Sequence, residues 1–464
     1  MTSHSPLPRV ALLLALTLSL AAPVPADDLD AVAGVPFREG VVIGIEDLTR
    51  IRDYIPPPFW EHRDYFFFEG MQLRIGPFFA DYSPSDLRKE IDRELGGKAR
   101  IGRDERGEGW LEFYVAGTPF PQIDLRDPDA GLKIAWNATH QHDPMEGAGH
   151  FRLATFSRGG MRESLFYQGH FWGLRLANRI DRVAQGGLYF PDEERRSGGK
   201  ITLEYPSDYR TLAAVGYRYL VGDDRPLSEI ARDAWAYIPQ LRRVRRFPAS
   251  TEEDQAIPGT EFLIEDINGF NFRTGVIQKY GFELVGEAEV LTPIDTTLLG
   301  FPLDENPNLG PSGFSVANDV WQLRKAWVLD IRKKSAKPVY SRKRLWIDQQ
   351  TYSSLYAAAY DRRGELWRLI YVVHRWSESP AHKRVSEACD RRGPNRLHHL
   401  RKNGSGHPQV EGAERFLYPI GHIVVNVRNG KGSRLEAWDA HATHLRDADI
   451  RRNLDSNRLS IGGR

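Results

Sequence analysis

One group of residues has types and spacing that fit metal chemistry. His140 and His142 are separated by one residue, Gln141, and Asp143 follows directly. Imidazole and carboxylate groups at such short spacing can bind the same metal ion. The competing interpretation is a polar cluster at the end of a strand over 133–140, because Asp143-Pro144 ends the alternating pattern. No third ligand follows at a spacing typical of a metal site, so we favour the polar cluster and predict no resident metal.

The familiar catalytic motifs are absent from the sequence. It contains no Gly-x-Ser-x-Gly elbow, phosphate-binding loop, Gly-x-Gly-x-x-Gly fingerprint or His-Glu-x-x-His zinc helix. Carboxylate pairs such as Asp127 and Asp129 lie in turn-like contexts, where solvation is the simpler account. We therefore predict no catalytic residue and no cofactor.

The densest run of charge consists of Arg242, Arg243, Arg245 and Arg246. On a strand these arginines would lie on both faces. One interpretation is contact with anionic lipid headgroups or an acidic partner. The other is a solvated edge strand, where positive charge blocks pairing with a second sheet. Four arginines in five residues exceed what edge protection needs, and the sequence leaves both interpretations open.

The N-terminus predicts export. Arg9 precedes an apolar run over 10–22, and small residues precede Asp27, which is the pattern of a secretory signal peptide over residues 1–26. The run is shorter than the roughly 20 apolar residues that span a bilayer. Cleavage after Ala26 would release a periplasmic protein of a Gram-negative bacterium with no membrane span. The one cysteine, Cys389, lies far from that cut, so we expect no lipid anchor.

Composition limits the classes of partner. Of 63 basic and 62 acidic residues, only Arg9 precedes the predicted cut, which leaves 62 of each sign. This balance argues against a general nucleic-acid binder, which normally carries a basic stripe. A single cysteine also excludes an internal disulfide framework and a multi-cysteine zinc site.

The elements that must position these residues are mostly strands. Alternation of apolar and polar side chains predicts strands at 110–116, 133–140, 150–157, 164–172, 201–205, 212–220, 234–239, 261–267, 282–290, 321–331, 340–347, 353–360, 366–376, 421–428 and 433–439. Helices are expected only near 84–95, 46–53 and 225–233. Residues 377–412 are polar and form a predicted loop or insertion before the final strand pair.

These patterns predict a mainly β chain of the α+β class. We expect a large antiparallel sheet, open or forming an incomplete β-barrel, with a few helices covering an apolar cavity, in one domain over 27–464. The candidate lining residues are Trp136, Phe282, Leu284, Trp321, Leu323, Trp327 and Leu329. Lys325 interrupts this apolar face, either as a snorkelling stem or as a headgroup partner. The competing interpretation is an ordinary core under helices.

Several segments resemble the signature of a large uncharacterised family of exported proteobacterial proteins, often labelled outer-membrane lipoprotein-sorting proteins. They are 114–121, 127–137, 234–239, 242–246, 265–266, 269–270, 324–329, 343–348 and 360–368. The resemblance implies a fold similar to the lipoprotein carriers LolA and LolB, an incomplete antiparallel barrel around a hydrophobic cavity. It also implies that the protein functions together with inner-membrane exporters of the resistance-nodulation-division type.

We therefore expect a non-enzymatic periplasmic carrier or chaperone of lipid, acylated protein or other hydrophobic cargo. One alternative is an exported hydrolase of lipid or polymer, assisted by a metal at His140 and His142. The other is an outer-membrane assembly or adhesion module that binds a protein partner.

Overall fold

The computed structural model describes most of the chain. The described residues are 34–105, 107, 109–140, 146–157, 160–191, 193–204, 211–219, 232–238, 241–247, 253, 255, 259–272, 277–296, 309–380, 413–442 and 447–459. The predicted signal peptide over 1–26, the predicted helix near 225–233 up to residue 231, and most of the predicted insertion lie outside these ranges.

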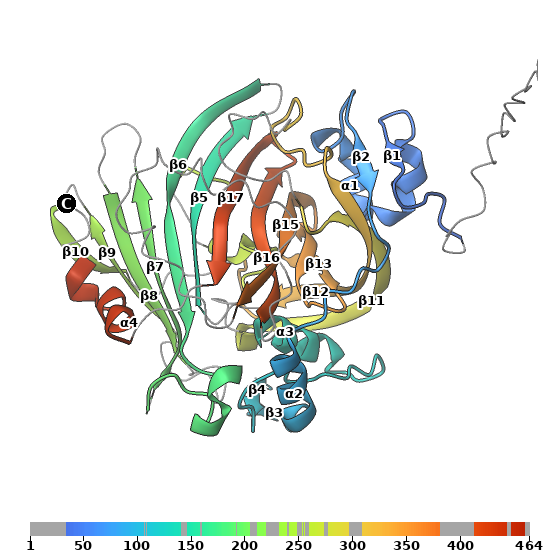
Figure 1. Cartoon of the computed structure of the whole chain (residues 1–464). Coiled ribbons are helices and arrows are strands. Elements are labelled where there is room, and N and C mark those ends of the chain that lie inside the picture. The colour runs from blue at the N-terminus through green and yellow to red at the C-terminus, as the bar shows by residue number, and fades with distance from the viewer. Residues whose placement is uncertain are drawn as a thin grey trace, which may run out of the picture.

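A single large sheet dominates the molecule. It has 15 strands in the order β1-β2-β12-β13-β14-β15-β16-β17-β5-β6-β7-β8-β9-β10, with β11 paired to β12. All pairings are antiparallel except that of β2 with β12. The sheet is mixed, strongly curved and not closed (Figure 1). The predicted class, a mainly β chain with an open sheet and few helices, is confirmed.

The strands of this sheet are β1 (Val42–Ile43), β2 (Leu73–Ile75), β5 (Glu146–Ser157), β6 (Gly160–Arg175), β7 (Arg195–Glu204), β8 (Thr211–Tyr219), β9 (Arg232–Ile238), β10 (Arg243–Phe247), β11 (Tyr280–Pro293), β12 (Val320–Lys333), β13 (Arg342–Asp348), β14 (Ser354–Tyr360), β15 (Leu366–Pro380), β16 (Ala413–Asn426) and β17 (Lys431–Ala442). A separate hairpin pairs β3 (Arg100–Arg103) with β4 (Gly109–Glu112). The α-helices are α1 (Pro57–Glu61), α2 (Asp86–Leu95), α3 (Ala130–His140) and α4 (Asp447–Asn453). Short 3-10 turns include η1 (Leu48–Tyr54), η5 (Ile264–Asp266) and η6 (Ile277–Lys279).

We call strands β11–β17 the body of the sheet. Both faces of its central strands are buried, whereas β11 at its side has one exposed face that carries Glu283 and Glu287. One cluster joins α1 and the N-terminal turns to the sheet through rings such as Phe59, Tyr356 and Tyr371. A second cluster on the body joins α3 and segments 262–272 and 277–280 to residues such as Leu345, Ala357 and Ile370. Alternating residues of one strand, such as Ala357 and Ala358, belong to different clusters, as burial of both faces requires.

We call strands β6–β10 the wing of the sheet, seen on the left of Figure 1 with α4 against it. On one face Leu174, Val215 and Tyr237 pack against Ile450 of α4 and Leu454. This cluster is distinct from the two clusters of the body, although β6 also contributes the half-buried residues Phe171 and Tyr167 to those two clusters.

The predicted helix near 84–95 is confirmed as α2. The side chain of Ser85 accepts a hydrogen bond from the backbone N–H of Arg88 at 3.3 Å, and Gly96 follows the last turn. The shorter helix expected over 46–53 is the 3-10 turn η1. In both cases a polar residue at the start of the helix and a Pro or Gly after its end predicted the position of the helix.

The predicted strand over 133–140 is wrong, because these residues belong to helix α3. The helix is buried on nearly every side, so apolar residues occur at alternating as well as helical spacings. Gly131 packs so closely on β11 that an added Cβ would lie 2.7 Å from the carbonyl oxygen of Phe282. This tertiary contact, which the local pattern does not contain, holds the helix against the sheet.

Two other boundaries differ from the prediction. Segment 261–267 is not a strand but contains η5, because the Asp266 carboxylate accepts the Leu263 N–H at 3.1 Å and bends the chain. The polar segment expected to begin at 377 begins later, since β15 continues to Pro380 and pairs there with Ala413 of β16. The final strand pair is confirmed as β16 and β17.

Candidate functional site

The face of the wing opposite α4 is the candidate binding surface. In register across four strands lie Ile201 of β7, Ala214 of β8, Ala236 of β9 and Arg245 of β10. Ile201 is 44% exposed and Ala214 half-buried, whereas Ala236 is buried. The alternation that directs Val215 and Tyr237 into the α4 cluster directs this row to the other face. An apolar row that starts at an exposed isoleucine on β7 thus crosses the last strands of the sheet.

The arginine run forms the free edge of the wing. Strand β10 is the last in the sheet order, and Arg242 precedes it with a φ of 49°. Arg243 and Arg245 are exposed on the face of the apolar row. Arg246 lies on the other face, where its Nε donates to Asp233 at 2.8 Å and its guanidinium lies 5.8 Å from the Trp235 ring centroid. The predicted edge strand with arginines on both faces is confirmed; contact with headgroups stays a prediction.

The predicted cavity-lining residues fall into two clusters of the body. Trp321 and Leu323 belong to the cluster under α1, at 2% and 0% exposure. The α3 cluster contains the buried residues Trp136 and Leu329 and the half-buried residues Phe282, Leu284 and Trp327. Lys325 is exposed, with its Nζ 5.3 Å from the Phe79 ring centroid. The structure therefore does not bring all of them to one surface, and their lining role stays a prediction.

Of the two candidate metal ligands, His140 and His142, the structure describes His140. His140 ends α3 and is fully buried, with its ring centroid 4.3 Å from that of Tyr114. Arg88 and Arg175 donate to its carbonyl oxygen at 3.1 and 3.2 Å, which places positive charge at the helix C-terminus. His142 lies outside the described residues. Across the described part of the chain, no group of three or more His, Cys, Asp or Glu could hold a metal ion.

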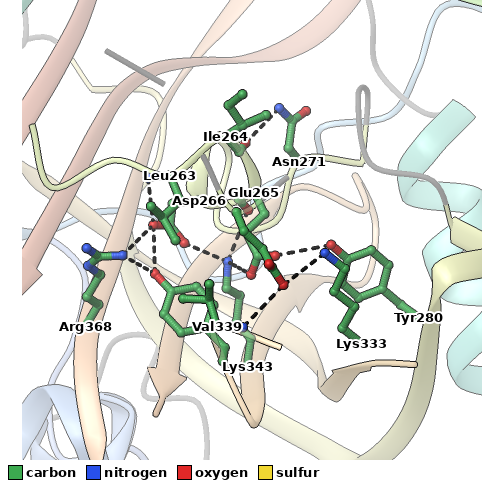
Figure 2. A network of polar contacts seen from close by, with 12 residues as sticks. Leu263, Ile264, Glu265, Asp266, Asn271, Tyr280, Lys333, Val339, Lys343 and Arg368 are labelled. Carbon is green, nitrogen blue, oxygen red and sulfur yellow. Dashed lines mark hydrogen bonds and ion pairs between the residues drawn. The ribbon is translucent and has the colours of Figure 1, made fainter. Parts of the chain in front are cut away.

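A buried polar network joins three segments of the body (Figure 2). Lys343 Nζ of β13 lies 2.8 Å from Asp266 Oδ1 and 3.4 Å from Glu265 Oε1, both from η5. The Tyr340 hydroxyl donates to Asp266 Oδ2 at 2.9 Å. Arg368 of β15 donates to that hydroxyl and lies 3.5 Å from Asp266 Oδ2. Figure 2 shows the side chains of Arg368 and Lys343 pointing toward Asp266 of η5.

The electrostatics of this network follow from burial. Asp266, Lys343 and Arg368 are 0%, 2% and 5% exposed. Burial raises the pKa of Glu265, an effect that the nearby Lys343 ammonium opposes. Burial also raises the pKa of Tyr340, and the Asp266 carboxylate adds to that rise. Each charge has an opposite partner, as buried charges require.

The cavity beside the network is too small for a substrate. It is lined by residues including Glu265, Tyr280 and Lys343, and its volume is about 10 Å³. A space of this size holds about one water molecule. The network therefore connects the 261–272 loop to β13 and β15 and offers no room for a reaction.

Family-like segments meet in the body. Glu265 and Asp266, Lys343, and Arg368 come from three segments that carry the resemblance, and they form the buried network. Arg324 comes from a fourth such segment, and it pairs at 2.7 Å with Asp348, which ends the segment that begins at Lys343; both residues are buried. Several segments that carry the family resemblance thus supply the buried charged residues that connect strands of the body.

The chain belongs to the family described as "Protein of unknown function (DUF1329)", whose model matches residues 90–392. The predicted resemblance is confirmed by this match. An uncharacterised protein of Pseudomonas aeruginosa, PA3922, is 28% identical over 301 residues, which are 63% of this chain and 61% of that protein. The match thus spans less than two thirds of the relative's own length.

Two solved structures match much of this chain at low identity and low TM-score. A domain from Vibrio parahaemolyticus, provisionally described as an outer membrane lipoprotein-sorting protein, is 16% identical with a TM-score of 0.42, covering 72% of this chain and 100% of that one. A LolA superfamily protein, NE2245 from Nitrosomonas europaea, is 12% identical with a TM-score of 0.32, covering 68% and 96%. Likenesses this remote assign no role to any residue.

Sequence reasoning missed the wing surface. The sequence does contain a signal for this surface, namely the glycines at 173, 199 and 216 inside strands. Glycine inside a strand often marks a site where a ligand or another backbone approaches closely. Only the register of β6–β9 shows that these glycines lie side by side.

Proposed function

We propose that this protein is a non-enzymatic carrier or chaperone that binds a hydrophobic cargo, a lipid or an acylated protein. The observation that supports this most is the open wing, where an apolar row with Ile201 at 44% exposure crosses a sheet face opposite the α4 cluster. Ile201 is the exposed residue of this row, and a large apolar side chain left at the surface of a sheet is suited to reversible contact with an apolar molecule.

The proposed place of action is the periplasm. The predicted signal peptide over 1–26 supports export, and no helix in the described ranges is long and apolar enough to cross a membrane. The exposed arginines Arg243 and Arg245 would contact anionic headgroups during loading and release. A partner of the resistance-nodulation-division exporter type fits this role as donor or acceptor of cargo.

Native mass spectrometry with lipid extraction tests the proposal. The mature protein purified from its own host should carry lipid adducts that organic extraction releases, and the emptied protein should take up a fluorescent fatty acid. A protein that arrives without lipid and takes up none of the probe would contradict the carrier function.

A further inference from the structure

Three glycines lie side by side on the open face of the wing. Gly173 of β6 pairs with Gly199 of β7, which pairs with Gly216 of β8. Ala234 of β9 continues the row. All four residues are partly exposed. At the usual spacing between strands the row is roughly 14 Å long, and it runs across the strands.

Within 4 Å, the described chain would make few contacts with a Cβ added at two of these glycines. A Cβ added at Gly173 would meet only the Gly198 carbonyl oxygen, at 4.0 Å. At Gly216 it would meet only the Asp233 oxygen at 3.4 Å and the Ala234 Cβ at 3.9 Å. By contrast, a Cβ at Gly432 in the body would overlap the Phe314 ring. The body uses its strand glycine to admit an aromatic ring, whereas the wing glycines leave a trough unfilled.

The trough has an apolar wall. The neighbouring row of Ile201, Ala214 and Ala236 runs parallel to it, two residues away along each strand. Interior glycines weaken a strand because they add backbone entropy and no packing, so three in register need a reason. A smooth floor beside an apolar wall is the shape that an unbranched hydrocarbon chain fills.

Positive charge stands at one end of this surface. Arg243 and Arg245 are exposed on the same face at the β10 edge. Within the described residues neither makes an ion pair with a carboxylate within 4.0 Å, whereas Arg246 on the other face pairs with Asp233. By register the glycine row ends at Phe247 of β10, the apolar row beside it ends at Arg245, and Arg243 lies one row further along the same face. An amphiphile with its chain in the trough would therefore turn its anionic head past Phe247 toward these guanidinium groups.

We propose that the glycine row of β6–β8 is the binding trough for one acyl chain of an anionic lipid, with the head held by Arg243 and Arg245. The inference rests on the proposed carrier function and deepens it by naming the cargo class and the surface. The trough admits the chain because no side chain rises from its floor, so a side chain added there excludes the lipid.

The test measures binding of dansyl-labelled undecanoic acid by fluorescence titration. The variant carries Gly173→Val and Gly216→Val, positions where a Cβ meets no close contact. We expect its dissociation constant to rise by at least about tenfold, with a melting temperature equal to or above that of the wild type. The matched control is Gly281→Val in β11, where a Cβ would meet only the Arg332 carbonyl oxygen at 3.9 Å; its affinity should not change.

A second pair of measurements locates the head. The double substitution Arg243→Gln and Arg245→Gln should raise the dissociation constant of the acid probe by about threefold to tenfold. It should leave the dissociation constant of the uncharged methyl ester of the probe unchanged. An unchanged affinity in the double valine variant, or in Gly216→Val alone if the double variant does not fold, would overturn the trough while leaving the carrier function standing. Failure of the wild type to bind either probe would instead overturn the carrier function itself.

Discussion

The body and the wing are parts of one sheet that use their two faces differently. In the central strands of the body both faces are covered. Aromatic rings such as Phe59 and Tyr371 fill one side, and charges such as Asp266 and Lys343 are buried in pairs. In the wing one face packs on α4 and the other carries glycine, alanine and a half-exposed isoleucine. The comparison shows that the buried core lies mainly in the body, whereas the proposed binding surface lies on the wing.

The largest expected effect is in the buried network of the body. Asp266→Ala leaves Lys343 and Arg368 buried without their shared carboxylate, so we expect the free energy of unfolding to fall by about 3–5 kcal/mol. Urea denaturation measures it. The control is Glu283→Ala, whose partner Arg332 is half-exposed, and it should cost less than about 1 kcal/mol. Equal losses in the two variants would show that the network does not stabilise the body.

Substitutions of strand glycines should have opposite effects on stability in the body and in the wing. Gly432→Ala places a methyl group in the space of the Phe314 ring and should destabilise the protein by about 3 kcal/mol, at the upper end for overpacking. The same change at Gly216 meets ordinary contacts and should stabilise the strand by about 0.5–1 kcal/mol. The free energies of unfolding of the two variants give the comparison. A destabilised Gly216→Ala protein would mean that the wing face is packed.

A buried histidine in the body predicts pH dependence. Burial lowers the pKa of His374 to about 3, below its usual value of 6.5. The neutral form is favoured in the folded state, so this contribution is present above pH 6.5 and is lost as the pH falls from 6.5 toward 3. Between pH about 7.5 and about 5 the free energy of unfolding should fall by about 2 kcal/mol from this group. His374→Leu should flatten that part of the profile, and an unchanged slope would contradict the assignment.

The smallest expected effect is at the wing edge. Arg246 is more than half exposed in its pair with Asp233, with side-chain exposures of 55% and 13%. Arg246→Ala should change the free energy of unfolding by about 0.2–1 kcal/mol, an effect that decreases with added salt. A loss well above that range in urea denaturation would show that the edge is part of a folded core.

The sequence predicted what depends on local pattern. Alternation located most strands, and Ser85 with Gly96 located α2. It failed for α3, where Gly131 packs on β11 and burial on all sides makes helical and alternating spacings coincide. It also failed at Asp266, whose carboxylate turns the chain by bonding to a backbone N–H.

The candidate site depended on register, which no local pattern contains. The arginine run and its two faces could be predicted from five residues. The trough could not, because Gly173, Gly199 and Gly216 become neighbours only when three antiparallel strands are aligned. Likewise, Trp321 and Trp327 share an alternating pattern, yet the structure places them in different clusters.

The central claim is that cargo binds on the wing and not within the body. Photo-crosslinking with a diazirine-bearing fatty acid, followed by peptide mapping, tests it most directly. The account predicts crosslinks in β6, β7, β8 and β9, lost in the variant with Gly173→Val and Gly216→Val. Crosslinks confined to β12–β15, beside Trp321 and Leu329, would contradict it and return the binding site to the body.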